Sequence, residues 1–237
     1  MRLNQWLTAF FGICLSLAAS ANSTLNTFDN TYSAKLFGFN ITVNSKLDPL
    51  SNGNYLYTFN ASSSVGKVAE GTEIKWLESE KRVLPLRYTY KRKGLGKDRD
   101  DELIFDWATL KLTNVRKNQV TNLDANQRLH DSLSYQVQLS QDLIAGKNNF
   151  SYAVTNGRKI KNYKFEIVGE EVLQTPLGEV KTVKVKRSRE NDDLVTYAWF
   201  AKDFQHLLVR MQQEEDGSDY TIYISKASIN GKVIEHF

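Results

Sequence analysis

Three adjacent polar residues, His130, Asp131 and Ser132, carry the functional groups that a serine hydrolase uses. In such an enzyme the histidine lies between the serine and the acid in a converging chain of hydrogen bonds. Consecutive residues do not converge in this way, because neighbours point about 100° apart on a helix and to opposite faces on a strand. The chain also lacks a G-x-S-x-G sequence around a nucleophilic serine. We therefore expect no catalytic residue and no enzyme.

The residues after this triplet predict a helix. Apolar side chains recur at helical spacing from Leu133 to Ile144, while Tyr135 points the opposite way. Gly146 is placed to end the helix. Asp131 or Ser132 is then placed to cap the first turn, where a side-chain oxygen accepts a free backbone N–H. We expect this helix to close over one end or face of a sheet.

Metal and cofactor sites are not indicated. The three histidines lack the i, i+4 spacing of an H-E-x-x-H helix. Acidic groups at 98–102, 189–192 and 214–219 do not match a spaced calcium loop, and solvated turns explain them more simply than weak calcium binding. The glycines of residues 94–96 lack the rest of a phosphate-binding or dinucleotide-binding motif. We expect neither a metal nor a cofactor.

The N-terminus resembles a secretory signal peptide. Arg2 precedes an apolar run from Trp6 to Ala19, and an Ala-Ser-Ala sequence ends at Ala21. A membrane anchor is the alternative, but a run of roughly 14 residues is shorter than the ~20 that a spanning helix needs. We expect residues 1–21 to be a cleaved signal peptide and the mature protein to be periplasmic or secreted. The chain's single cysteine, Cys14, would leave with it.

The charge balance gives no case for nucleic-acid binding. The formal net charge is +4, whereas nucleic-acid binding needs a concentrated basic face. The basic run at residues 91–93, with Lys97 and Arg99, is answered by acidic residues at 98–102, which indicates a charged hairpin tip. Contact with anionic lipid headgroups or lipopolysaccharide phosphates is the alternative. No later segment is apolar over the ~18 residues of a membrane span, so none is expected in the mature chain.

Most of the chain after residue 25 predicts β-strands. In "NYLYTFNAS", residues 54–62, the aromatic side chains alternate and share one face. In "LPLRYTYKRK", one face is predicted to carry Leu84, Leu86, Tyr88 and Tyr90. Short turns between such runs favour antiparallel neighbours. We expect a mainly β fold in a single domain over residues 25–237. It would be a large curved antiparallel sheet, half-barrel or barrel-like, with one packed α-helix.

Aromatic residues in these strands are the one suggestion of a binding site. A curved sheet with an aromatic face could line a cavity for an apolar ligand. The candidate ligand-binding residues are Tyr55, Tyr57, Phe59, Tyr88, Tyr90, Trp107 and Trp199. An ordinary filled core is the alternative, because aromatic side chains also dominate protein cores.

Several stretches in this order resemble a family of exported bacterial proteins known as domain of unknown function 3108. They are "VLPLRYTYKR" (83–92), "LIFDWATLKL" (103–112), "HDSLSYQVQLSQDLIAG" (130–146), "NYKFEIVGEEVLQTPLGEVKTVKVKR" (162–187) and "TYAWFAKDFQHLLVRMQQEEDG" (196–217). At residues 206–210 the chain lacks the proline of the family's "LPVRI" pattern. The resemblance implies an exported, mostly β protein, similar in fold to the curved-sheet carriers of lipoproteins and lipids in the bacterial envelope. It transfers no catalytic residue.

Two functions therefore stay open. The first is a periplasmic non-enzymatic protein that binds or carries a lipid-like apolar ligand in the concavity of the sheet. The second is a cell-envelope interaction or assembly protein with a filled core, which would meet a protein partner through the charged hairpin or an exposed sheet edge. A hydrolase with dispersed residues is a third possibility, and it would need a pocket with two carboxylates.

Overall fold

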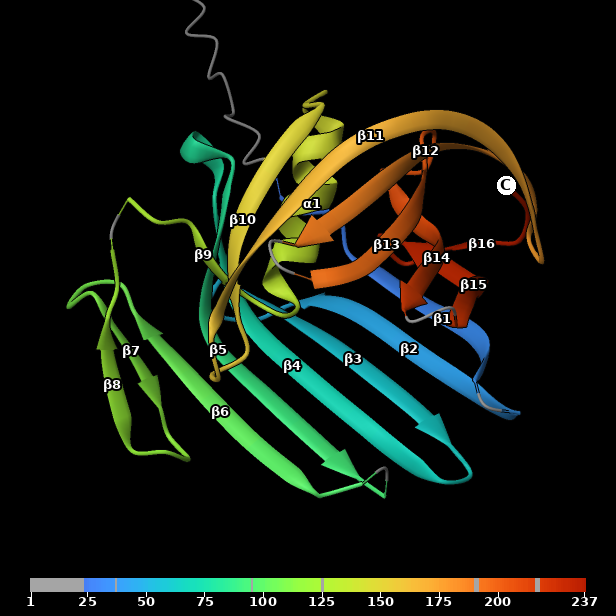
Figure 1. The fold of residues 1–237 in the computed structure, drawn as a ribbon. Helices are drawn as coiled ribbons and strands as arrows, with labels where there is room; N and C mark the ends of the chain where they lie inside the picture. Colours follow the sequence, from blue (N-terminus) through green and yellow to red (C-terminus); the bar gives the residue numbers. More distant parts are fainter. Residues whose placement is uncertain (1–23, 37, 95, 125, 190–191, 216–217) are drawn as a thin grey trace, which may run out of the picture.

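The computed structural model describes residues 24–36, 38–94, 96–124, 126–189, 192–215 and 218–237. The predicted signal peptide lies outside these ranges. The described part of the chain contains sixteen strands, one short 3-10 helix, η1 (Glu78–Glu80), and one α-helix, α1 (Ser134–Ile144) (Figure 1). The strands are β1 (Phe28–Leu36), β2 (Phe39–Pro49), β3 (Tyr55–Ser63), β4 (Gly66–Leu77), β5 (Arg82–Lys93), β6 (Arg99–Asp106), β7 (Lys111–Asn114), β8 (Gln119–Asn122), β9 (Leu129–Asp131), β10 (Asn149–Thr155), β11 (Ile160–Thr175), β12 (Gly178–Arg189), β13 (Asp192–Ala201), β14 (Leu207–Glu215), β15 (Ser218–Ile229) and β16 (Lys232–Ile234).

All these strands belong to one sheet. Strands β1 to β8 form one antiparallel meander, and strands β10 to β15 form a second. The two meanders join where β1 pairs antiparallel with β15. Strands β8 and β9 stand at the two ends of the order, so the sheet is open, and β9 adds the one parallel pairing, with β10. The predicted large antiparallel sheet with one packed helix is confirmed.

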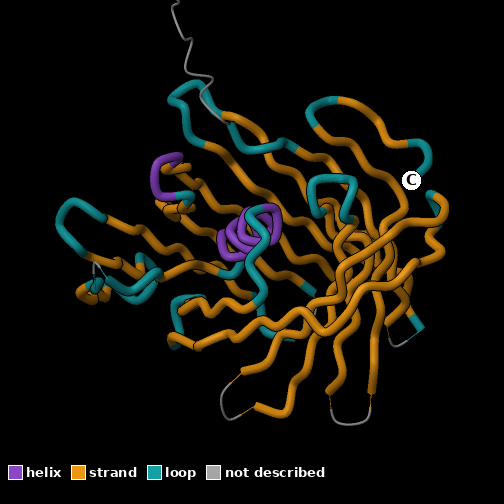
Figure 2. Tube along the Cα trace, turned by 90° about the horizontal axis from the view of Figure 1, so that it is seen from above, coloured by secondary structure: helices purple, strands orange, loops and turns teal. Residues whose placement is uncertain are grey.

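The sheet curves around α1. In Figure 1, β2 to β6 spread below the helix while β10, β11 and β12 arch over it. The view from above places α1 near the middle of the molecule, with strands on its sides (Figure 2). Register shifts interrupt the pairings of β1 with β15, β4 with β5, β11 with β12, β12 with β13 and β13 with β14. Because such bulges bend a strand and increase its twist, they explain how this open sheet curves around a helix.

A bulge also corrects the predicted face of β5. The register between β4 and β5 skips Leu86. Val83 and Tyr88 are consequently both buried, although an uninterrupted strand would point them to opposite faces. The prediction that Leu84 and Leu86 share a face with Tyr88 and Tyr90 is therefore wrong. One extra residue exchanged the two faces of the strand, and the local alternation of apolar and polar residues does not indicate this bulge.

Helix α1 is packed on two sides rather than one. Val137 belongs to a buried cluster formed with β3 to β7, whereas Leu139 and Leu143 belong to a second cluster formed with β10 to β13. Ile144, predicted on the buried arc, is 42% exposed. Tyr135, predicted on the outer side, packs against aromatic rings of β11. The periodicity located the helix, but its surroundings decided which side chains became buried.

Asp131 holds the first turn of α1 and is fully buried. Its carboxylate accepts the backbone N–H groups of Leu133 and Ser134 at 2.8 and 2.9 Å, and the hydroxyl of Thr72 at 2.7 Å. This satisfies donors that the start of a helix leaves free. The neighbouring His130 packs its ring edge against Tyr152, and burial lowers its pKa to about 3. Asp131 thus satisfies donors at the start of the helix as predicted, although Leu133, and not Asp131 or Ser132, directly precedes the first helical residue.

Candidate functional site

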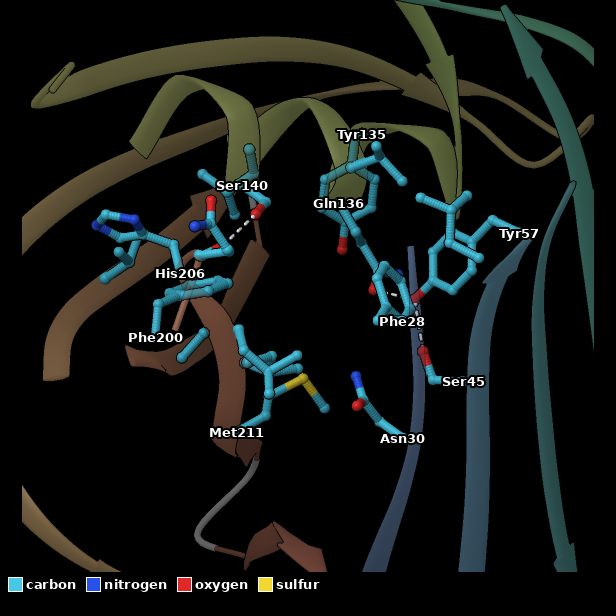
Figure 3. Close-up of a pocket in the computed structure, with 18 of the residues that line it drawn as sticks. Phe28, Asn30, Ser45, Tyr57, Tyr135, Gln136, Ser140, Phe200, His206 and Met211 are labelled. Carbon is cyan, nitrogen blue, oxygen red and sulfur yellow. Dashed lines mark hydrogen bonds between the residues drawn. The ribbon is translucent and has the colours of Figure 1, made fainter. Parts of the chain in front are cut away.

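A cavity of about 270 Å³ lies between α1 and the concave side of the sheet (Figure 3). Its walls come from β1, β2 and β3 on one side, from β11 to β15 on the other, and from the segment 204–206 between β13 and β14. Its volume is close to the lower end of the ~300–1,000 Å³ typical of small-molecule sites. The curved sheet therefore leaves a space that the helix roofs without filling.

Most of the wall is apolar, and strand alternation explains how. Val185, Ala198, Met211 and Ile222 lie side by side in register across β12, β13, β14 and β15, and all four line the cavity. Leu139 lines it from α1. The small side chain at position 198 stands in the middle of this row. A larger residue there would enter the open space.

A chain of hydrogen bonds links the sheet to the helix along one wall (Figure 3). The hydroxyl of Ser45 donates to the Tyr57 hydroxyl at 3.1 Å, and Tyr57 donates to Oε1 of Gln136 at 3.1 Å. The Gln136 amide then donates to the carbonyl of Ser132 at 3.0 Å. These polar groups satisfy one another, so the wall stays neutral and its acceptors are largely used.

Arg187 of β12 brings the positive charge of the site. Its Nη1 donates to the Tyr135 hydroxyl at 3.2 Å, and its Nη2 donates to the Thr196 hydroxyl at 2.6 Å. Its guanidinium carbon lies 4.9 Å from the centre of the Tyr163 ring. Burial raises the pKa of Tyr135, while the nearby Arg187 charge lowers it. Among the described residues that line the cavity, none is Asp or Glu.

Two of the seven predicted aromatic residues line the cavity. Tyr57 and Phe59 reach it from β3. The other five lie outside its lining: Tyr55, Tyr88, Tyr90, Trp107 and Trp199. A role in ligand binding therefore stays a prediction for Tyr57 and Phe59, and this cavity offers none to the other five.

Structural partners account for several of those five. The Tyr88 hydroxyl donates to Glu70 at 2.5 Å, and burial raises the pKa of Glu70 to about 6. The Trp107 indole donates to the carbonyl of Pro85 at 2.7 Å. Trp199 is 2% exposed and lies between two cationic side chains, with the Arg210 guanidinium 4.3 Å from its ring centre. These aromatic side chains are packed into the fold away from the cavity.

Arg187 and Asn30 line the cavity but are not among the residues predicted from the sequence. Asn30 lies between Phe28 and Tyr32 on an otherwise apolar face of β1, whereas Arg187 follows Val183 and Val185 on a face of β12 that also carries Glu179 and Lys181. A polar side chain in such a row signals a buried polar role. The sequence contains that signal at Asn30 but not at Arg187, whose face already carries other charged residues.

The charged hairpin is arranged as its sequence indicated. Strands β5 and β6 pair so that Lys91 and Asp100 lie opposite each other, with their charged atoms 3.7 Å apart. Arg87 and Glu102 pair at 2.7 Å.

Within the described ranges, no group of three potential metal-ligating side chains is found. In the same ranges, no helix combines the length and apolar character needed to cross a membrane.

A family profile described as "Protein of unknown function (DUF3108)" matches residues 78–225, more than half of the chain. The chain belongs to the DUF3108 family. The matched region runs from η1 into β15 and includes α1 and Arg187, whereas Asn30, Ser45 and Tyr57 lie before it. The resemblance noted from sequence motifs is thereby confirmed.

The DUF3108 chain is also similar in fold to solved structures. The crystal structure of a beta-barrel-like protein of domain of unknown function DUF1849 from Brucella abortus matches with a TM-score of 0.61 and 10% identity, over 87% of this chain and 99% of that one. At this identity the likeness shows the fold alone. A DUF1329 family protein from Desulfovibrio piger, with 11% identity over 89% and 88% of the two chains, has a TM-score of 0.27, which carries no argument. No curated protein matches the chain.

Proposed function

We propose that this DUF3108 protein is an exported, non-enzymatic binding protein that holds a lipid-like apolar ligand in the cavity beneath α1. The observation that carries the proposal is the cavity itself, which has mainly apolar walls and a few convergent polar groups. This combination is characteristic of small-molecule sites. The alternative function requires a filled core, whereas the lining residues surround a cavity.

Apolar burial supplies enough free energy for useful affinity. Each buried CH₂ group contributes about 0.8 kcal/mol, and a dissociation constant of 1 μM corresponds to about 8 kcal/mol. A chain of roughly ten or more carbons therefore reaches the micromolar range, with additional carbons offsetting the loss of freedom on binding. The proposal requires no catalytic residue. A glycosidase mechanism in this cavity gains no support, because its described lining lacks the paired carboxylates that such a mechanism uses.

Native mass spectrometry of the gently purified protein tests the binding function. We expect a bound species that is released on denaturation and whose mass fits a lipid. In the variant Ala198→Phe, the new ring would occupy the middle of the cavity, so the bound species should disappear. Ala69→Phe is the matched control, because Ala69 lies on β4, is half-buried and does not line the cavity.

Two results would contradict the binding function. One is a wild-type protein that releases nothing but water and salt and also fails to bind added dodecanol. The other is a bound species that Ala198→Phe and Ala69→Phe remove equally. The export component has a separate test, since the mature protein should be recovered from the periplasm or medium with a mass that lacks residues 1–21.

An exposed sheet edge favours the second candidate function, an envelope interaction protein. All four residues of β8 are exposed, and Val120 is 57% exposed at this end of the sheet. An unpaired edge strand offers N–H and C=O groups to another chain. A partner captured by the wild type and lost from Val120→Pro would support that function. Reversing the charges of Lys91, Arg92 and Lys93 tests the hairpin instead, and a partner retained by that variant excludes the hairpin version.

A further inference from the structure

The charges around the cavity have one sign. Among its described lining residues, Arg187 is the single side chain that is formally charged at neutral pH. His206 also lines the cavity, but burial and the nearby Lys202 charge lower its pKa, which keeps it neutral. A ligand that complements this wall carries one negative charge.

Arg187 has hydroxyl partners but no carboxylate among the described residues. Tyr135 and Thr196 accept from its two terminal nitrogens, and its buried Nε atom has no hydrogen-bond partner there. Neutral hydroxyl groups compensate a half-buried guanidinium only in part. Its planar donors match a carboxylate, which forms shorter and stronger charge-assisted hydrogen bonds.

Asn30 presents a second unused donor. The residue is 1% exposed, and its Nδ2 atom has no hydrogen-bond partner of good geometry among the described residues. Burial raises the pKa of the Tyr32 hydroxyl, and the nearby Asn30 side chain offsets part of that rise. Its Oδ1 accepts the backbone N–H of Ser228 at 3.4 Å, which leaves the NH₂ group for the cavity. Figure 3 shows the Asn30 amide facing the open space, with Met211 across from it. A buried donor without a partner costs about 1–3 kcal/mol, which an acceptor atom on a ligand would recover.

Three buried polar atoms on the described lining have no hydrogen-bond partner. Those of Asn30 and Arg187 are donors, and Nδ1 of His206 donates or accepts according to its tautomer. The Tyr57 hydroxyl and Oε1 of Gln136 already accept hydrogen bonds. A ligand made only of hydrocarbon would leave the Arg187 donor unpaired, whereas a ligand with a carboxylate at one end would satisfy it.

We propose that the ligand is a single-chain amphiphile with a carboxylate head, a long-chain fatty-acid anion, and that Arg187 binds the head. This inference rests on the proposed binding function and specifies its ligand class. The tail lies against Leu139 and Phe200 and points toward the rim of the cavity at the exposed Ile144. The volume of about 270 Å³ accommodates one chain more readily than the two chains of a phospholipid.

A pair of ligands that differ only at the head tests this inference. Dodecanoate and dodecanol are titrated separately at pH 7.5, below their aggregation thresholds, into protein stripped of any bound species. The wild type should bind dodecanoate about 10-fold more tightly or better, because a hydrogen bond to a charged group contributes ~1.5–3 kcal/mol. Arg187→Gln should remove this preference, so that the ratio of the two affinities falls to about 1.

Matched variants control for unrelated damage. Arg87→Gln makes the same substitution at an exposed arginine of β5 that lies outside the cavity, so it should keep the full preference. Asn30→Asp adds a negative charge to the cavity lining and should weaken dodecanoate binding by about 3-fold or more relative to dodecanol binding. Asn44→Asp, at an exposed residue of β2, is its control. If Arg187→Gln fails to fold, Arg187→Lys retains the charge and should keep most of the preference.

The outcomes separate this inference from the proposed function. Equal affinities for dodecanoate and dodecanol in the wild type would overturn the anionic head, while the binding function would stand. Failure to bind either ligand, with no bound species in the native protein, would overturn both. A preference that survives in Arg187→Gln would show that Arg187 does not hold the head.

Discussion

On the side of α1 that faces β5 and β10, buried polar groups are paired with one another, whereas on the side that faces β1 and β13 to β15 they border an unfilled space. We call the side that faces β5 and β10 the packed side. There, the Gln138 amide accepts from the backbone N–H of Val83 at 2.8 Å and donates to the carbonyl of Lys81 at 3.0 Å. Asp142 accepts from the Tyr152 hydroxyl at 2.5 Å and from Lys147 at 2.7 Å. We call the side that faces β1 and β13 to β15 the cavity side.

Residue type does not distinguish the two sides. Aromatic and amide side chains occur on both, and Asp131 and Asn30 are almost equally buried. What differs is that the cavity side also holds buried polar atoms without a partner, among them those of Asn30 and Arg187, and that the neighbouring side chains leave space beside them. Unpaired donors beside open volume indicate a place for a ligand, whereas paired groups in a dense core indicate stability.

The largest expected difference between the sides is at Asp131. Replacement by Ala removes the acceptor for the N–H groups of Leu133 and Ser134 and for the Thr72 hydroxyl. Several donors would be left buried and unpaired, so the free energy of unfolding should fall by about 3 kcal/mol. Urea unfolding followed by circular dichroism measures it. Asp131→Asn retains one acceptor and should lose less, and a loss below ~1 kcal/mol for Asp131→Ala would contradict the capping role.

A pH effect should come from His130 on the packed side. Burial lowers its folded pKa to about 3, whereas the unfolded value is about 6.5. The unfolded state therefore binds the extra proton first, and the stability contributed by neutral His130 is present above pH 6.5 and lost as pH falls toward 3. At pH 5 the loss should be about 2 kcal/mol. The measurement is the free energy of unfolding of wild type and His130→Gln between pH 7 and 5.

Glu70 acts in the opposite direction over part of this range. Burial raises its folded pKa from 4.5 to about 6, so the folded state binds the proton first and gains stability as pH falls from about 6 to 4.5. His130→Gln should therefore become more stable on acidification in that interval. If the variant and the wild type show the same pH profile, His130 does not contribute the expected term.

A phenyl ring added on the packed side and one added on the cavity side should change the free energy of unfolding in opposite directions. Ala153 of β10 packs against the cluster that contains Val137, and Ala153→Phe should overpack it and lower the free energy of unfolding by about 1–3 kcal/mol. Ala198→Phe enters the cavity and should raise it by about 0.5–2 kcal/mol in ligand-free protein. Thermal unfolding of the two variants measures both effects. Equal destabilisation would mean that the cavity side is as closely packed as the other.

The smallest expected effect is at Asn30. Its one hydrogen bond, from the backbone N–H of Ser228, spans 3.4 Å, and its amide nitrogen has no partner among the described residues. Asn30→Ala removes this unpaired donor, which stabilises the protein, but it also removes the acceptor of the Ser228 N–H and some packing. Because these effects offset each other, the free energy of unfolding of ligand-free protein should change by no more than about 0.5 kcal/mol. Paired measurements with Asp131→Ala test the contrast at two equally buried polar positions. A loss of ~2 kcal/mol would place Asn30 with the structural residues.

Local patterns predicted the elements well and the site poorly. The alternation in residues 54–62 predicts β3 correctly because a strand exposes successive side chains to opposite faces wherever it lies. The same reasoning failed at Leu86, where a bulge adds one residue and reverses the alternation. Of the five aromatic candidates that do not border the cavity, four are on strands as expected, and Trp107 lies in the turn directly after β6. Their position relative to the cavity was not predictable, since which part of a curved face remains empty depends on every neighbouring strand.

The sequence by itself determined the antiparallel β character, the position of α1, the capping role around Asp131 and the family resemblance. Each of these depends on residues close together in the chain, through side-chain periodicity or short-range hydrogen bonds. Only the tertiary structure decided that Asn30 of β1 and Arg187 of β12 border one cavity, and that Tyr88 and Trp199 do not. Pairing of β1 with β15, bulges in several strands and the volume of α1 set that arrangement together, because the shape of an interior space depends on all the side chains that surround it.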